Sequence, residues 1–278
     1  MQSTQTQIFH LSQGQLNNLE SCPRKFQHTF LDKLNPPLEQ EKEESRNLGN
    51  RFHLLMQQLE MGLPIDAFLA ADSLLQSWSD GLANVAPEIF KPIQHSNIFR
   101  DSEHFRTLQI KDYLLSVIYD LIIADDEKAE ILDWKTYPKP LNKREIEQNW
   151  QTRLYMYVLA QTSHYPPENI SMTYWFVQSP GQPQSLKFNY SSLLHQQIEK
   201  KLDLLLNQLS HYLEIYHQGE NLPQVKEGSK LCEWCQYARR CDRVRGYSDA
   251  NLSSNTMVIG QTLDNSLLNI ANIQEVIL

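Results

Sequence analysis

Two aspartates lie in a stretch of the sequence whose side chains favour β-strands. Residues 117–123 and 131–134 are rich in β-branched and aromatic residues, and the polar run 125–128 between them fits a four-residue hairpin loop. Counting outward from that loop places Asp120 directly opposite Asp133. Directly opposed residues share one face of a sheet, with Cβ atoms about 4.5–5.5 Å apart. The spacing therefore predicts two carboxylates side by side.

A pair of facing carboxylates is destabilising unless a cation or a shared proton relieves the repulsion. Mg²⁺ and Mn²⁺ take carboxylate oxygens, and Mg²⁺ usually binds one or two of them together with substrate phosphate. Lys135 lies two residues after Asp133, so it shares that face and can orient a water or offset negative charge at phosphorus. Leu132 and Trp134 alternate with these residues, and we expect them in a core on the other face. A surface hairpin with solvated charges is the alternative that the residues alone leave open.

The chain has four cysteines, and their spacing is the second clue to chemistry. Cys232, Cys235 and Cys241 form a compact group, whereas Cys22 lies about 210 residues earlier. In a reducing cytosol a disulfide framework is disfavoured. Four thiolates suit either tetrahedral zinc or a 4Fe–4S cluster, and the spacing alone does not separate the two. Four unrelated buried thiols are the remaining alternative.

The sequence resembles the PD-(D/E)XK nucleases, and within them the RecB-type branch. Asp120 followed by Asp133–Lys135 is similar to the paired acidic motif of that superfamily. Gly49–His53 resembles the G-x-x-F-H motif of an early helix, and Gln151–Tyr155 resembles the Q-x-x-x-Y motif of the helix after the lysine strand. The motifs occur in the family's order. One departure is Val117, which stands where the family usually has a glycine three residues before the first aspartate.

The resemblance implies a role for each of these residues. The metal ligands that it implies, for Mg²⁺ or Mn²⁺, are His53, Asp120, Asp133 and the backbone carbonyl of Trp134. It also implies that Lys135 positions the attacking water and that Gln151 and Tyr155 line the active site. The implied reaction is hydrolysis of DNA phosphodiester bonds, with exonuclease action on single-stranded DNA. A non-catalytic DNA-binding or assembly subunit of a helicase–nuclease complex is the main alternative.

One cysteine before the nuclease core and three after it is similar to the pattern of iron–sulfur nucleases. These include the CRISPR-associated RecB-like exonucleases and the AddB nuclease subunit. The resemblance implies that a 4Fe–4S cluster bound by Cys22, Cys232, Cys235 and Cys241 staples the two ends of the chain together. It also implies DNA repair, recombination or CRISPR adaptation as the setting, with a helicase or a CRISPR integration complex as a partner. A zinc-stapled hydrolase is the alternative.

Further candidate residues lie near the motifs and near the cysteines. Gly49 lies one helical turn before His53, and a glycine there would let a substrate backbone approach the helix closely. Taken alone, His53 fits a capped or solvated histidine better than a metal ligand. Glu103 is a possible acidic ligand, but we expect it to be solvated. The basic residues near the cysteines either contact DNA phosphates or are solvated: Arg24, Lys25, Arg239 and Arg240.

The elements that position these residues follow from the hydrophobic pattern. Strands are expected near residues 172–177 and 185–189 in addition to the hairpin. Helices are expected at 9–31 with a break at Cys22–Pro23, at 48–59, irregularly over a helical insertion at about 62–96, at 143–161 and at 192–217. With the resemblance, this predicts an α/β fold: a PD-(D/E)XK restriction-endonuclease-like core with a small mixed sheet flanked by helices, plus an iron–sulfur-stapled helical cap. The nuclease domain is expected to span 1–245, and 246–278 to form a polar tail, partly disordered or a docking helix.

Composition limits the class of protein. The 278 residues are 41% hydrophobic and 21% charged, which is ordinary for a soluble globular protein. No apolar run approaches the roughly 20 residues needed to span a bilayer, and the polar residues 1–7 do not resemble a secretory signal, so we expect a cytoplasmic protein. The net charge of −8 argues against non-specific coating of nucleic acid, although residues 226–245 hold six basic and three acidic side chains.

Overall fold

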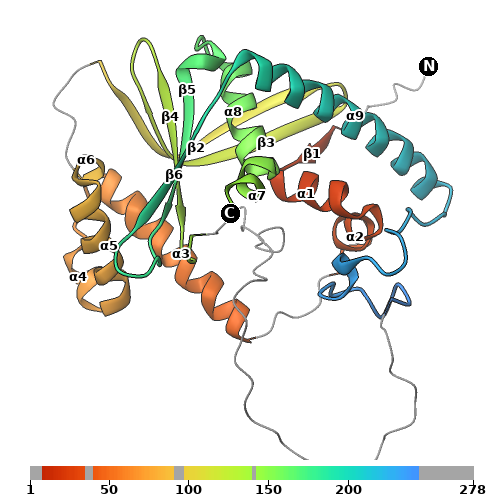
Figure 1. Cartoon of the computed structure of the whole chain (residues 1–278), viewed down its shortest axis with the longest axis horizontal. Coiled ribbons are helices and arrows are strands. Elements are labelled where there is room, and N and C mark those ends of the chain that lie inside the picture. The colour runs from red at the N-terminus through yellow and green to blue at the C-terminus, as the bar shows by residue number, and fades with distance from the viewer. Residues whose placement is uncertain (1–7, 35–39, 91–96, 140–141, 244–278) are drawn as a thin grey trace, which may run out of the picture. The chain divides into compact units, whose positions relative to one another are not determined.

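The computed structural model describes residues 8–34, 40–90, 97–139 and 142–243. In these residues the centre of the fold is a six-stranded mixed sheet with the order β1-β3-β4-β5-β6, and β2 also pairs with β3 (Figure 1). The strands are β1 (Phe9–Leu11), β2 (Phe99–Ile110), β3 (Tyr113–Ala124), β4 (Ala129–Lys135), β5 (Ile170–Phe176) and β6 (Gln184–Asn189). The β1–β3 and β4–β5 pairs are parallel and the others antiparallel. The predicted mixed sheet is confirmed, and the predicted tail at 246–278 lies outside the described residues.

The β3–β4 hairpin has the predicted register. Its backbone pairs run from Ala124 with Ala129 at the four-residue loop to Leu121 with Leu132. The ladder therefore stops one residue short of Asp120. The strands β2 and β3 form a second, longer hairpin, whose pairs run over nearly the whole length of both strands.

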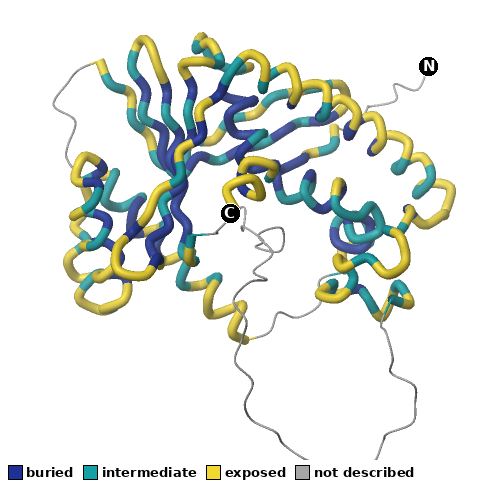
Figure 2. The backbone as a smooth tube through the Cα atoms, in the orientation of Figure 1, coloured by how far each residue is buried: buried dark blue, intermediate teal, exposed yellow. Residues whose placement is uncertain are grey.

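Helices before β2 cover one face of the sheet at the β3–β4 end. They are α3 (Gln40–Glu60), α4 (Asp66–Ala70), α5 (Ser73–Val85) and α6 (Pro87–Phe90). The Asp72 side chain begins α5 by accepting hydrogen bonds from the backbone N–H groups of Leu74 and Leu75. Leu132 and Trp134 lie in the resulting core, as predicted, and Figure 2 shows the sheet among the most buried parts of the chain. Its helical partners include Phe52, Leu55, Met56, Leu75, Trp78 and Leu82.

The predicted helix at 143–161 is two helices, α7 (Lys143–Gln148) and α8 (Trp150–Thr162). Asn149 separates them because its backbone is extended and its side chain accepts a hydrogen bond from the Gln151 N–H at 2.8 Å. An asparagine in this position ends one helix and caps the next. The buried α8 packs against β2, β3 and β5, so the break places Gln151 in the first turn of a helix lying on the sheet.

The chain forms two compact units. Among the described residues, the first unit comprises 8–13, 40–90, 97–139 and 142–204 and holds the sheet with α3 to α8, and the second comprises 14–34 and 205–243. The second unit holds most of α1 (Gln13–Ser21), α2 (Pro23–Phe26), the π-helix Gln27–Leu31, the end of α9 (Ser192–His217) and the short 3₁₀ helix Lys230–Cys232. The predicted break at Cys22–Pro23 is confirmed, and α9 has the predicted limits.

The predicted helix at 9–31 was wrong at its start, because Phe9–Leu11 is the strand β1. It pairs in parallel with residues Tyr113–Leu115 of β3. A three-residue strand has no periodicity of its own, so only its distant partner determines its conformation. None of the helices in the described residues is long and apolar enough to cross a membrane.

Candidate functional site

Asp133 is a buried carboxylate that is held from two sides. Only 1% of its surface is exposed. Lys135, on the same strand, brings its Nζ to 2.7 Å from Asp133 Oδ1, and Gln151 donates a hydrogen bond from Nε2 to Asp133 Oδ2 at 2.6 Å. Burying a charge is unfavourable unless it is paired and hydrogen-bonded. Lys135 and Gln151 therefore balance the charge of Asp133 and fix its orientation.

The Asp120 side chain binds the backbone of β4 just beyond the last β3–β4 backbone pair. Its Oδ2 accepts a hydrogen bond from the backbone N–H of Trp134 at 2.7 Å. Lys135 meets Asp133 directly, as predicted, whereas Asp120 is bound to the next peptide group of β4. The direct facing of Asp120 and Asp133 stays a prediction.

His53 joins helix α3 to both strands of the hairpin. Its Nε2 lies 3.1 Å from the carbonyl oxygen of Trp134, and its Nδ1 lies 3.3 Å from Asp120 Oδ1. A carbonyl and an ionised carboxylate are both acceptors only. An imidazole between two acceptors is satisfied when both nitrogens carry protons, or when a cation replaces one of those protons. His53 is therefore held by both strands of the hairpin, and its role as a metal ligand stays a prediction.

Gly49 has a different use from the one expected. A Cβ atom at Gly49 would lie 3.1 Å from Thr136 Oγ1, which is tighter than ordinary contact. The absence of a side chain lets α3 approach the segment that follows β4, and no substrate is needed to explain the glycine. This close approach supports the contact between His53 and Trp134.

Glu103 was expected to be solvated, and the structure instead places it at the site. Its carboxylate, that of Asp120 and the His53 imidazole offer ligand atoms within 4.8 Å of one another. On β2 the pairs Ser102–Leu121 and His104–Tyr119 leave Glu103 opposite Asp120. Its φ of 51° is left-handed, a conformation that disfavours residues with a side chain by roughly 1–2 kcal/mol. The strained backbone at Glu103 thus places its carboxylate close to that of Asp120.

A missed turn explains why the sequence analysis undervalued Glu103. The β2–β3 hairpin has a two-residue turn, so Ile110 pairs with Tyr113, and counting back from that turn sets Glu103 opposite Asp120. Lys111, the first turn residue, has a φ of 55°. Asn-Gly and Asp-Gly are the usual signals of such turns, and Lys111-Asp112 carries neither.

The donor set fits a hard divalent cation. His53, Glu103 and Asp120 come from three different elements, α3, β2 and β3, and are all half-buried. Two carboxylates with an imidazole suit Mg²⁺ or Mn²⁺, which bind oxygen ligands and keep open positions for water and phosphate. Converging carboxylates repel each other, so a cation between them would also relieve that repulsion.

Two other positions of the family motifs lie on α8 and β3. Tyr155 is buried on α8; its ring packs edge-on against Tyr119, and its carbonyl accepts the Tyr119 O–H at 3.0 Å. Burial raises the pKa of Tyr119. Val117 pairs with Arg106 inside an unbroken β3, so the strand does not need the family's glycine there.

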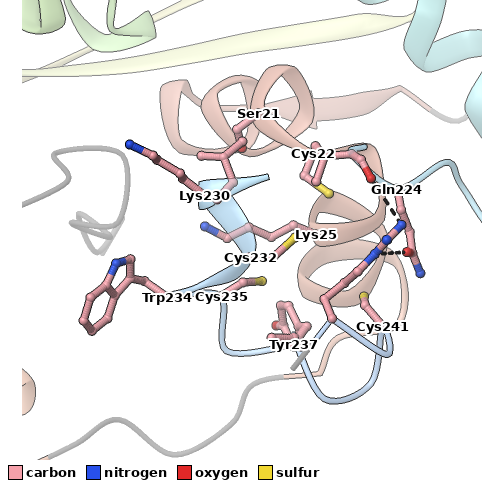
Figure 3. Close-up of a pocket in the computed structure, with 14 residues that line it drawn as sticks. Ser21, Cys22, Lys25, Gln224, Lys230, Cys232, Trp234, Cys235, Tyr237 and Cys241 are labelled. Atoms are coloured by element: carbon pink, nitrogen blue, oxygen red, sulfur yellow. Dashed lines mark hydrogen bonds between the residues drawn. The ribbon is translucent and has the colours of Figure 1, made fainter. Parts of the chain in front are cut away.

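The four cysteines line one pocket of the second unit (Figure 3). Cys22 precedes α2, and the other three lie in the loop that follows α9. Protein contacts also hold these two segments together. Arg24 donates from Nε to the Leu222 carbonyl at 2.7 Å, and the Gln27 side chain accepts from the Leu222 N–H at 2.8 Å. The predicted joining of the early cysteine to the later three therefore agrees with the packing of the chain itself.

The charge state of the cysteines depends on what they bind. Burial raises the pKa of both Cys232 and Cys241, and the neighbouring Cys235 and Cys22 raise it further. Thiols that resist ionisation must release their protons when they become metal ligands. Burial also lowers the pKa of Lys25, an effect that Cys235 and Cys22 partly oppose.

A histidine that the sequence analysis did not consider lies beside Cys241. His28 is buried; its Nε2 is 3.7 Å from Cys241 Sγ and its Nδ1 is 2.9 Å from Asp32 Oδ2. Tyr216 donates a hydrogen bond to the other oxygen of Asp32. Burial raises the pKa of Asp32, but hydrogen bonds from His28, Tyr216 and Gln27 outweigh it, so the pKa is below its usual value. Asp32 thus fixes the ring of His28 next to the Cys241 sulfur.

Comparisons with known proteins address the family and the fold of the chain. The model of the PD-(D/E)XK nuclease superfamily matches residues 10–242. A crystal structure from Eubacterium rectale, named "Putative exonuclease", is similar with a TM-score of 0.52 and 10% identity, over 92% of this chain and 94% of that one. The crystal structure of SSO0001 matches with a TM-score of 0.38 and 12% identity, over 84% and 86% of the two chains. No curated protein matches the sequence significantly.

Proposed function

Since the chain belongs to the PD-(D/E)XK nuclease superfamily, we propose that it is a metal-dependent deoxyribonuclease that hydrolyses phosphodiester bonds. The observation that carries this proposal is the buried pair of Asp133 and Lys135 beside the group formed by His53, Glu103 and Asp120. A structural hairpin has no need for a lysine and an aspartate that are almost fully buried.

The proposed roles follow from the contacts of each side chain. His53, Glu103 and Asp120 would hold a divalent ion, with Asp133 contributing once substrate and metal rearrange its contacts with Lys135 and Gln151. Such an ion supplies Lewis-acid stabilisation of a phosphoryl oxygen.

The protein's own groups account for the remaining steps. Lys135 holds its ammonium group at the site, where it orients the attacking water and offsets the negative charge that builds on phosphorus. Gln151 keeps Asp133 oriented, and the contact of His53 with the Trp134 carbonyl fixes the imidazole ring. In this proposal Tyr155 acts by supporting Tyr119 and α8 from the core, and not by touching substrate.

We propose the RecB-type branch and exonuclease action on single-stranded DNA as the finer assignment. The ordered motifs around His53, Asp133 and Gln151 support this branch, and so does the contact of Gln151 with Asp133. DNA repair, recombination or CRISPR adaptation is the proposed setting, with a helicase or a CRISPR integration complex as the proposed partner.

We further propose that the four cysteines bind a 4Fe–4S cluster. The four cysteines line one pocket of the second unit. Four thiolates suit either a 4Fe–4S cluster or tetrahedral zinc. The order of one cysteine before the nuclease core and three after it, which is similar to that of iron–sulfur nucleases, supports the cluster.

A non-catalytic DNA-binding subunit that keeps the fold is the second candidate. An inactive copy has no requirement for Asp133 and Lys135, whose burial as a charged pair is difficult to maintain without a function. Their presence favours the enzyme.

The test is a nuclease assay with anaerobically purified protein on end-labelled single-stranded and double-stranded DNA, with and without added Mn²⁺. We expect Mn²⁺-dependent shortening of the single strand from an end. DNA binding without cleavage under every metal condition would instead establish the non-catalytic subunit. Iron and sulfide analysis of the same preparation tests the cluster. A result of one zinc per chain without sulfide would replace the 4Fe–4S assignment with a zinc site.

A further inference from the structure

The second unit exposes an unusual aromatic side chain beside the cysteines. Trp234 lies between Cys232 and Cys235 in the sequence and is 71% exposed. The other four tryptophans are buried or half-buried. Tryptophan is enriched at binding surfaces, because its large ring gains much from being covered by a partner.

Two lysines accompany this ring. Lys25 and Lys230 line the cysteine pocket with Trp234, and Figure 3 shows the three side chains extending toward the same side. The neighbouring Leu231 is also exposed. The surface therefore combines a flat apolar ring with two cationic side chains.

The local charge opposes that of the whole chain. The net charge of the protein is −8, whereas residues 226–243 hold five basic and three acidic side chains, and Arg24 and Lys25 lie in the helix beside them. The segment that carries the exposed ring is therefore positive, unlike the chain as a whole. Phosphates bind to cationic grooves, and unpaired bases stack on aromatic rings, so the two features together match single-stranded nucleic acid.

We propose that Trp234, Lys25 and Lys230 form a stacking subsite for single-stranded DNA. Trp234 stacks on one unpaired base, and the two lysines contact the adjoining phosphates. This inference rests on the proposed function, because it takes single-stranded DNA as the substrate of the nuclease. It adds to that function a binding subsite whose residues take no part in hydrolysis. A duplex keeps its bases stacked inside, so the subsite discriminates in favour of single strands.

The test measures binding of a fluorescein-labelled oligo(dT) and of a matched duplex by anisotropy. Metal-free buffer prevents cleavage during the measurement. Loss of one stacking contact predicts that Trp234→Ala binds oligo(dT) about 5- to 150-fold more weakly. Trp234→Phe keeps an aromatic ring and should stay within a few-fold of the parent. Leu193→Ala, which removes an exposed apolar side chain from the start of α9, should bind like the parent.

The lysines make a separate prediction. Lys230→Gln should reduce the slope of log affinity against log salt by about 0.7, the value for one phosphate contact on a single strand. Iron content and thermal unfolding of each variant show whether the second unit remains folded.

Two outcomes would overturn the stacking subsite and leave the proposed nuclease function untouched. The first is equal oligo(dT) binding by Trp234→Ala and the parent, which would point to a protein partner for the exposed ring. Equal weakening on the single strand and the duplex would also contradict base stacking. The proposed function fails on a different result, the absence of cleavage by the parent protein with Mn²⁺, so the two failures are distinguishable.

Discussion

His53 and Trp134 are 81 positions apart in the chain, yet the imidazole Nε2 of one lies 3.1 Å from the backbone carbonyl of the other. This contact holds α3 against the end of β4. The same ring faces Asp120 through Nδ1. One histidine thus connects the helix to the two strands that carry the acidic residues.

Removing this histidine should affect metal binding more than folding. We predict that His53→Ala raises the Mn²⁺ concentration needed for half-maximal cleavage by roughly tenfold or more, because one ligand of the site is lost. His211→Ala, which removes an exposed imidazole from α9, is the control. A metal titration of His53→Ala that matches the parent curve would assign the residue a structural role only.

Glu103 allows metal binding to be separated from stability. Glu103→Gly removes a carboxylate but relieves the left-handed φ of 51°. The relief, about 1–2 kcal/mol, offsets the roughly 0.5–1 kcal/mol that glycine costs in a strand, so the unfolding free energy should be unchanged or slightly higher. Thr107→Gly, an exposed position of the same strand with no positive φ, should destabilise by about 1 kcal/mol.

Activity should follow the carboxylate and not the stability. Both Glu103→Gly and Glu103→Gln should cleave more slowly and require more Mn²⁺ than Thr107→Gly. Urea unfolding and a metal titration of the three proteins give both quantities. If Glu103→Gln is fully active at the Mn²⁺ concentration that the parent requires, Glu103 is not a metal ligand.

Cys22→Ala should act far from its own position. If Cys22 shares one cluster with the later cysteines, it closes a loop of more than 100 residues, and such a crosslink is worth about 5 kcal/mol. We predict that the variant loses its iron and the brown colour, and that proteolysis releases the segments around residues 14–34 and 222–243. The β3–β4 hairpin should stay protected because its contacts are local. Ser21→Ala is the matched control, and a normal visible spectrum with full iron in Cys22→Ala would contradict a shared cluster.

The raised pKa values of Cys232 and Cys241 predict a pH effect on reduced, metal-free protein. Between the ordinary thiol pKa of about 8.5 and the raised folded values, the folded chain keeps protons that the unfolded chain has lost. Stability should therefore fall as pH rises above about 8.5, as measured by urea unfolding at several pH values. Cys232→Ser/Cys241→Ser should show a shallower fall, and so should iron-loaded protein, whose thiolates are already ionised. Parent and variant curves with equal slopes would contradict these pKa directions.

Local patterns predicted those parts of the fold that are stabilised by neighbours in sequence. The four-residue loop at 125–128 predicted the β3–β4 register, and the apolar stripe of 192–217 predicted α9 to its limits. The division at Asn149 could also have been predicted, since asparagine is a strong N-cap residue. In each case the signal lies within a few residues of the feature.

Features that depend on distant partners were missed or misread. β1 is a strand only because β3 accepts it, and Gly49 is required by Thr136, which lies 87 positions later. Glu103 reaches Asp120 through a strained backbone that no propensity predicts, and His28 meets Cys241 across 213 positions. At the candidate site, the family motifs pointed to Asp120 and Asp133, and the structure added Glu103 and the contacts that orient these side chains.

The most direct test of the account compares cleavage and binding in Asp133→Asn and Lys135→Ala. Each removes one member of the buried pair, and the asparagine preserves the size of the side chain it replaces. Glu130→Gln, an exposed carboxylate of the same strand that pairs with Lys187, is the control. The account predicts that both site variants cleave end-labelled single-stranded DNA at least about 100-fold more slowly than the parent with saturating Mn²⁺. Both should bind this DNA in metal-free buffer as the parent does. The control should cleave at the parent's rate. Cleavage by both variants within a few-fold of the parent would contradict the assignment of this pair to catalysis.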